Sequence, residues 1–142
     1  MSKADEVIKR LDLSPLPQEG GYFRFVKQFG NGAGMIYYLM TADAFSHMHS
    51  LTEDETWIFL EGDPIEQTTV SPEGMVSKVI LNQSNRISVV EKGYFQATGI
   101  AEVKEGYALV STVMSPRYRD DMYTHGASVP RIREIRELED LL

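Results

Sequence analysis

Two histidines and a glutamate in the segment Ser46–Asp63 are the residues best suited to chemistry. His47 and His49 stand at positions i and i+2, and Glu55 follows a polar connection over residues 50–54. Side chains at i and i+2 of a β-strand project from the same face, so the two imidazoles converge if this segment is a strand. Two imidazoles and one carboxylate form a facial set that binds a divalent transition metal and leaves positions open for substrate. We therefore expect His47, His49 and Glu55 to be metal ligands.

The same three residues have a simpler interpretation. An isolated His-x-His pair on an edge strand is more often solvated, or hydrogen-bonded to the backbone, than bound to a metal. Glu55 directly follows Glu53 and Asp54, so it also fits a solvated acidic loop. The residues alone leave both interpretations open.

The composition limits the partners of the chain. Its 142 residues suffice for one domain, residues 1–142, and 42% of them are hydrophobic. The net charge of −7, without a basic tract, makes nucleic acid and anionic membranes poor partners. The chain has no cysteine, and its start lacks the apolar run of a signal peptide, which together favour a cytoplasmic location. Gly20-Gly21 is followed by neither a helix start nor a lysine, so no nucleotide cofactor is expected.

Short strands separated by turn residues dominate the chain and predict an all-β sandwich or barrel. Apolar spacing predicts a short helix over residues 3–11, and a second helix is expected over residues 130–142. Strand Met35–Met40 is apolar on both faces, so it should be covered on both sides, for example by a second subunit. The expected strands are Tyr22–Phe29, Met35–Thr41, Phe45–Ser50, Thr56–Leu60, Ile65–Val70, Met75–Leu81, Ile87–Val90, Tyr94–Gly99 and Tyr107–Met114.

The chain resembles a small cupin family of unknown function that carries an EGGYF signature. The matching stretches run in order over most of the chain and include Glu19-Gly20-Gly21-Tyr22-Phe23, Asp54-Glu55, Trp57, Gly62-Asp63-Pro64 and Phe95-Gln96-Ala97. The resemblance implies a double-stranded β-helix, the cupin jelly roll, related in shape to sugar-nucleotide epimerases and usually dimeric. It thus implies a homodimer and a small-molecule ligand in the barrel cavity.

Some positions depart from the family. Ser50 stands where the family usually has an arginine, which removes an anion clamp, and Phe95 replaces a tryptophan. A Pro-Gly-Phe stretch is changed here to Pro116-Arg117-Tyr118. In the second half of the cupin metal motif, Gln96 stands where the last histidine would be.

Three functions follow from this resemblance and the residues. The first is a metal-dependent isomerase or oxygenase in which Gln96 adds a fourth, weaker ligand to His47, His49 and Glu55. The second is a metal-free sugar epimerase or isomerase, with His49 as base, Glu55 orienting it and Tyr38 or Tyr22 returning a proton. The third is a module that binds a small polar ligand without turnover. For all three functions, the residues expected to contact the ligand are Arg24, Ser46, Trp57, Phe95 and Gln96.

Overall fold

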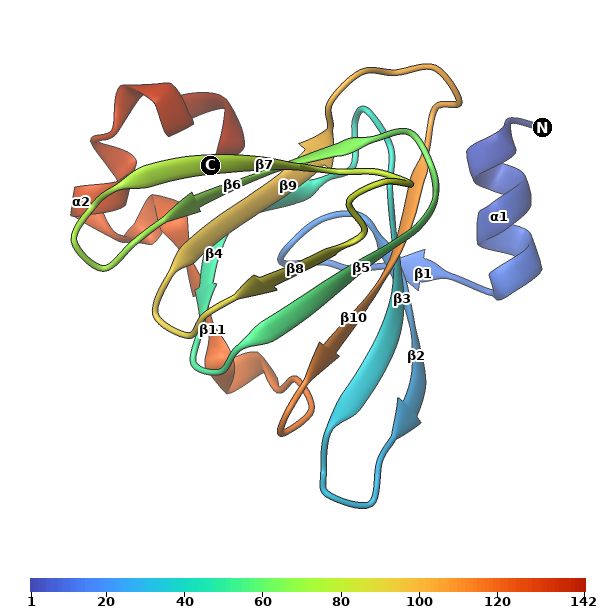
Figure 1. Ribbon diagram of the computed structural model, residues 1–142, viewed down its shortest axis with the longest axis horizontal. Coiled ribbons are helices and arrows are strands. Elements are labelled where there is room, and N and C mark those ends of the chain that lie inside the picture. The colour runs from blue at the N-terminus through green and yellow to red at the C-terminus, as the bar shows by residue number, and fades with distance from the viewer.

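Two antiparallel β-sheets face each other in the computed structural model, which describes residues 1–142 (Figure 1). The six-stranded sheet has the order β1-β2-β3-β10-β5-β8, and the five-stranded sheet the order β11-β4-β9-β6-β7. This is the jelly roll expected from the sequence. The strands are β1 (Ser14–Pro15), β2 (Tyr22–Gln28), β3 (Gly34–Met40), β4 (Ser46–Leu51), β5 (Glu55–Gly62), β6 (Ile65–Val70), β7 (Val76–Leu81), β8 (Ile87–Val90), β9 (Phe95–Ile100), β10 (Ala108–Met114) and β11 (Tyr123–His125).

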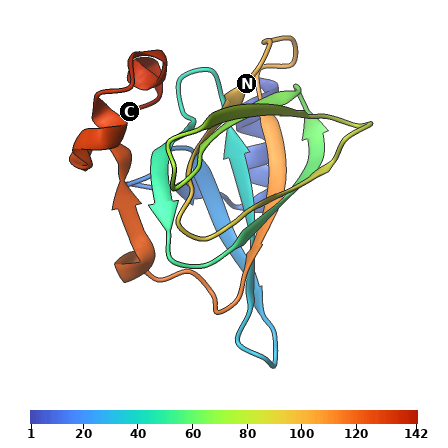
Figure 2. The ribbon, with the colours of Figure 1, turned by 60° about the vertical axis from the view of Figure 1, so that its left-hand side comes forward.

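All nine expected strands are present, and two short ones were missed. β1 pairs with β2, and β11 pairs with β4 (Figure 2, where β11 is orange-red and β4 is green-cyan). β11 places His125 opposite His49. The third histidine therefore belongs to the same sheet as the other two.

Helical segments cover the outer face of each sheet, at opposite sides of the molecule (Figure 1). Helix α1 (Lys3–Leu11) begins at a capping box, in which Ser2 and Asp5 bond each other's backbone N–H groups. Ala4 and Val7 of α1 pack on Leu39 and Leu109. Helix α1 therefore covers the outer face of β3 at Leu39, while Met35 and Tyr37 on the same face stay partly exposed.

The C-terminal segment covers the five-stranded sheet in several short pieces. The expected single helix over residues 130–142 is interrupted, because Ile135 has an extended backbone. Ile132 and Leu138 are fully buried against Met48 and Phe95 of the sheet. The pieces are η1 (Asp120–Met122), η2 (Gly126–Ser128), α2 (Pro130–Arg133) and η3 (Arg136–Leu141). No helix of the chain is both long and apolar enough to cross a membrane.

The space between the sheets is filled at one end and hollow at the other. Inward-facing residues alternate along β10, so Ala108 and Val110 pack with Trp57 in the main core. Farther along the same strand, Thr112 and Met114 line a cavity instead. One strand therefore supplies both the floor of the barrel and the wall of its open end.

The Gly62-Asp63-Pro64 stretch has a structural explanation. Gly62 has a positive φ of 97° and lies directly against the backbone of Tyr107. The Asp63 carboxylate accepts three backbone hydrogen bonds from residues 104–106, at 2.7–3.1 Å. Burial alone raises the pKa of Asp63, but these donors outweigh it and hold the pKa below its ordinary value. The motif ties the turn between β5 and β6 to the loop before β10, away from the cavity.

Candidate functional site

A cavity of about 380 Å³ opens between the two sheets at the hollow end of the barrel. Apolar side chains make up much of its wall, and a few polar groups are set among them, as in many small-ligand sites. The apolar residues include Leu16, Phe23, Phe25, Ile36, Leu51 and Met114. The charged and phenolic residues are Glu19, Glu55, Arg117, Tyr118, Asp120 and Tyr123.

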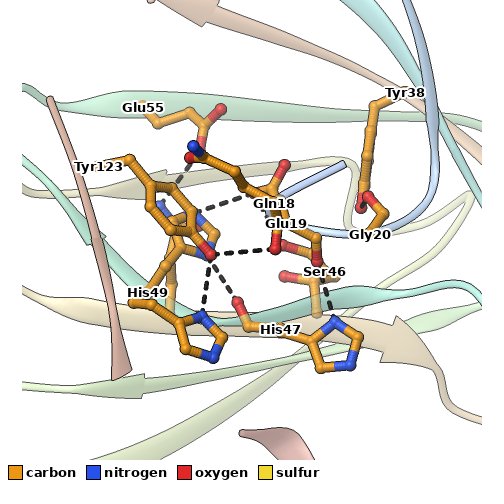
Figure 3. Close-up of polar contacts among 12 residues, drawn as sticks. Gln18, Glu19, Gly20, Tyr38, Ser46, His47, His49, Glu55 and Tyr123 are labelled. Carbon is orange, nitrogen blue, oxygen red and sulfur yellow. Dashed lines mark hydrogen bonds and ion pairs between the residues drawn. The ribbon is translucent and has the colours of Figure 1, made fainter. Parts of the chain in front are cut away.

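Glu19 is the central polar residue of the cavity, and the sequence did not single it out. Its Oε1 accepts a hydrogen bond from Ser46 Oγ at 2.9 Å and lies 2.9 Å from Nε2 of His49 (Figure 3). Its carbonyl oxygen accepts the backbone N–H of His47 at 3.0 Å. Both ends of Glu19 are thus fixed by strand β4.

Two glycines after Glu19 make this contact between the turn and β4 sterically feasible. Gly20 has a positive φ of 98°, and a Cβ there would collide with the carbonyl oxygen of Phe45. Gly21 has a φ of 79°, and a Cβ there would collide with the hydroxyl of Tyr38. The EGGYF signature therefore presents the Glu19 carboxylate, because only glycine allows so close an approach.

The substitution Gly20→Ala tests this explanation. Backbone strain together with the collision is expected to lower the free energy of unfolding by about 2 kcal/mol or more. Urea unfolding followed by circular dichroism measures this loss. Gly30→Ala is the matched control, since a Cβ there meets no atom within 4 Å. If both variants lost the same stability, the close packing at Gly20 would not be the cause.

His49 lies buried behind Glu19 and stacks on Tyr123, with ring centroids 5.1 Å apart. Its Nδ1 is 2.6 Å from the carbonyl oxygen of His47, so this nitrogen carries a proton and donates it. The Nε2–Glu19 distance is that of an ion pair, although Nε2 has no hydrogen-bond partner. The contact between the two side chains is therefore electrostatic. Burial alone lowers the pKa of His49, and the Glu19 carboxylate reverses this, so the pKa is raised overall.

Glu55 is the second carboxyl group of the cavity and begins strand β5. Gln96 Nε2 donates to Glu55 Oε1 at 3.1 Å, and Trp57 Nε1 donates to Gln96 Oε1 at 3.0 Å. Burial, followed by the negative charge of Glu19, raises the pKa of Glu55 from 4.5 to about 7. The chain from Trp57 through Gln96 fixes the orientation of this carboxyl group.

A β-bulge in β4 changes which of its side chains face the interior, so the expectation that His47 and His49 share one face is wrong. β4 pairs Ser46 with Thr98 and His49 with Gln96, so three steps along β4 correspond to two along β9. The extra residue turns both Ser46 and His49 toward the interior. His47 instead stacks on Phe45, with ring centroids 4.2 Å apart, and its Nδ1 lies 2.9 Å from the Glu19 carbonyl oxygen. The two histidines therefore do not converge on one point.

The expected metal ligands do not fit a metal in this arrangement. His47 faces the backbone of Glu19, Nδ1 of His49 is bonded to its own strand, and the Gln96 oxygen is bonded to Trp57. Within the chain, no three or more histidine, aspartate, glutamate or cysteine side chains are grouped so that they would hold a metal ion. The set His47, His49, Glu55 and Gln96 is therefore not a preformed coordination site.

Three other expected site residues lie outside the cavity. Arg24 is exposed on β2 and donates to the carbonyl oxygen of Leu11, while its neighbours Phe23 and Phe25 face inward. Phe95 faces the C-terminal segment, where Arg131 lies 5.4 Å from its ring centroid. Tyr38 is buried in the main core and donates to the carbonyl oxygen of Gly20.

Ser46, Trp57 and Gln96 are buried behind the cavity wall, where they support Glu19 and Glu55.

Tyr123, which the sequence did not indicate, lines the cavity from β11. Its hydroxyl lies 3.0 Å from His125 Nδ1. Burial and the charge of Glu19 raise the pKa of Tyr123 to about 12, so its phenol is protonated at neutral pH.

Comparisons with known proteins identify the fold. A hypothetical protein from Leishmania major has a TM-score of 0.87 at 22% identity, over 99% of this chain and 98% of that one. A protein from Shewanella oneidensis has a TM-score of 0.83 at 25% identity, over 97% of this chain and 98% of that one. A Bacillus subtilis oxalate decarboxylase studied for its Mn(II) centres has a TM-score of 0.64 at 9% identity, over 81% of this chain and 30% of that one. No protein of curated function matches the sequence.

The sequence itself matches the family described as the cupin superfamily (DUF985) over residues 5–125. This match spans most of the chain, and the whole-length structural similarities agree with it. The chain therefore belongs to the cupin superfamily, within the DUF985 family.

Proposed function

We propose that the protein is an enzyme that moves a proton within a small polar metabolite, as an isomerase or epimerase does. One observation carries this proposal: two carboxyl groups in different environments, Glu19 and Glu55, line the same largely apolar cavity. Glu19 lies against an imidazole and a hydroxyl, whereas Glu55 is buried with a pKa of about 7. Two carboxyl groups with such different surroundings are suited to act as base and acid at the same pH.

The two groups have separate roles. Glu19, as the carboxylate, accepts a proton from a carbon atom next to a substrate carbonyl group. Glu55, when protonated, donates its proton to the carbonyl oxygen, so that an enol (an enediol where that carbon carries a hydroxyl group) forms without a build-up of charge. Glu19 then returns a proton to the neighbouring carbon, or a proton reaches the other face of the same carbon, while the Glu55 carboxylate takes back a hydroxyl proton, and an isomerisation or an epimerisation is complete.

His49 is a positioning residue in this proposal and not the base. It does not line the cavity, and its Nδ1 donates to the strand backbone. Its cationic form holds the negative charge of Glu19 in place. Tyr123, which does line the cavity and is stacked on His49, takes the place that the sequence suggested for Tyr38 as a phenol near the substrate.

A divalent metal is the competing proposal, favoured by the Mn(II) centres of the oxalate decarboxylase with the same fold. The side chains expected to bind it are not gathered, so the present proposal uses only groups of the protein. Protein treated with a chelator is accordingly expected to keep its full activity.

Hydrogen exchange with solvent tests the proposal without knowledge of the substrate. Small hydroxy-ketones, hydroxy-aldehydes and keto acids would be incubated in D₂O with the protein, untreated and chelator-treated, and followed by proton NMR. At least one compound is expected to exchange a carbon-bound proton at the same enzyme-dependent rate with both preparations. Loss of exchange after chelation, restored by a metal ion, would refute the proposal in favour of the metal enzyme. Binding without exchange would refute it in favour of a binding module.

Two further expectations remain proposals. The family resemblance implies a homodimer, and the cysteine-free sequence fits a cytoplasmic location. Light scattering on the purified full chain tests the first, and fractionation of the producing cells tests the second.

A further inference from the structure

Arg117 is the one cationic side chain among the residues that line the cavity. Its guanidinium carbon lies 4.1 Å from the ring centroid of Phe25, and Nη1 donates to Gln28 Oε1 at 3.3 Å. No carboxylate lies within ion-pair distance of it, in contrast to Arg119, whose Nε is 3.2 Å from Asp121 Oδ1. Arg117 is exposed to solvent where it lines the cavity, and its positive charge has no ion-pair partner within the protein.

The surrounding backbone holds Arg117 in this place. Its N–H donates to the carbonyl oxygen of Gly32 at 2.8 Å, which ties it to the β2–β3 hairpin. Gly34 at the start of β3 has no side chain where Arg117 packs, and a Cβ there would lie 2.5 Å from the Arg117 Cβ. The Arg117 guanidinium therefore belongs to a segment held by backbone contacts, and it stacks on the Phe25 ring of the cavity wall.

Two of the three acidic side chains of the cavity already face an imidazole or are weakly ionised. Glu19 faces His49, and Glu55 is partly protonated at neutral pH. For the third, Asp120, burial of Tyr118 and the Asp120 carboxylate together raise the pKa of the Tyr118 phenol. The guanidinium of Arg117 is the one cationic group of the lining, and it has no ion-pair partner.

We infer that the substrate is a small monocarboxylic acid with an apolar or aromatic body, bound with its carboxylate on Arg117. The inference rests on the proposed function for the position of the reacting carbon, which lies toward Glu19 and Glu55. A planar guanidinium binds a carboxylate through two parallel hydrogen bonds, and Phe23, Phe25 and Ile36 accommodate the apolar body. A phosphate dianion is disfavoured, since one cation would face two negative charges in a cavity that also contains three acidic side chains.

Matched pairs of probes test the inference by binding, without turnover. Calorimetry and ligand-observed NMR would compare 3-phenylpropionate with 3-phenylpropanamide, hexanoate with hexanamide, and phenyl phosphate as the dianion. The wild-type protein is expected to bind at least one carboxylate about 10-fold more tightly than its amide and more tightly than the phosphate. In Arg117→Gln this preference is expected to disappear. Arg119→Gln, the matched control two residues away, should keep it.

The results separate this inference from the proposed function. Equal binding of both carboxylates and their amides, tighter binding of phenyl phosphate, or an unchanged preference in Arg117→Gln would overturn the inference. Proton exchange on neutral carbonyl compounds, independent of Arg117, would overturn the inference and leave the proposed function intact. A carboxylate preference that depends on Arg117, in a protein that exchanges no proton, would support the anion site and refute only the proposed function.

Discussion

Glu55→Gln is expected to be more stable than the wild-type protein at pH 8 and to lose proton exchange by 100-fold or more. The pKa of Glu55 is raised from 4.5 to about 7 by burial and by Glu19, so ionisation of Glu55 is less favourable in the folded protein than in the unfolded chain. Stability is therefore lost as the pH rises from about 4.5 to about 7, by on the order of 3 kcal/mol at most. Glutamine keeps an acceptor for Gln96 and removes this penalty, but it has no proton to donate to the substrate.

Denaturant unfolding at pH 4 and pH 8, combined with exchange rates, measures both effects. The stability gain of Glu55→Gln should be present at pH 8 and vanish near pH 4. The wild-type exchange rate should fall above pH 7, as Glu55 loses its proton. Glu73→Gln, in the exposed turn before β7, is the control and should change neither property. A destabilised Glu55→Gln at pH 8, or one with normal exchange, would show that Glu55 is not a buried acid used in the reaction.

The architecture could be predicted because its signals are local. Turn residues and apolar alternation define each strand by its own sequence, as does the capped, amphipathic segment of α1. Two elements lacked such a signal: β1 and β11 are two and three residues long, too short for alternation to be recognised. The C-terminal apolar spacing fitted one helix, whereas packing on the sheet favours an extended break at Ile135.

The site could be predicted only in part, because it depends on contacts between distant segments. Glu55 and Gln96 were singled out only as members of an expected metal site, and the structure joins them by a hydrogen bond. Glu19 was missed because its partners, Ser46 and His49, lie about thirty residues away and no local pattern indicates them. The alternation of a regular strand predicted that His47 and His49 share one face. The β-bulge that separates them adds a single residue to β4, and no residue pattern in this polar segment indicates it. The EGGYF signature was the one sequence signal that contained Glu19.

Glu19→Gln is the second decisive substitution, because it should reverse the direction in which the environment shifts the pKa of His49. In the wild-type protein, burial lowers the pKa of His49, but the Glu19 carboxylate outweighs burial and raises this pKa above 6.5. Protonated His49 therefore stabilises the folded protein. This stabilisation is fully present below pH 6.5 and is lost as the pH rises through the raised pKa. With a neutral residue at position 19, burial prevails, and the pKa of His49 is expected to fall below 6.5. Exchange should fall by 100-fold or more, because no base remains to accept the proton.

Imidazole NMR titration of this variant also provides an internal check at His125. The pKa of His125 is lowered by burial and by repulsion from His47 and His49. When His49 becomes neutral in Glu19→Gln, one source of repulsion disappears, so the pKa of His125 should rise while that of His49 falls. Ser46→Ala removes the other polar contact of the Glu19 side chain without changing any charge, and it should leave the order of the two pKa values as in the wild type. If both histidines moved in the same direction in Glu19→Gln, the imidazole of His49 would not be the counter-ion of Glu19, and the assignment of Glu19 as the base would fail with it.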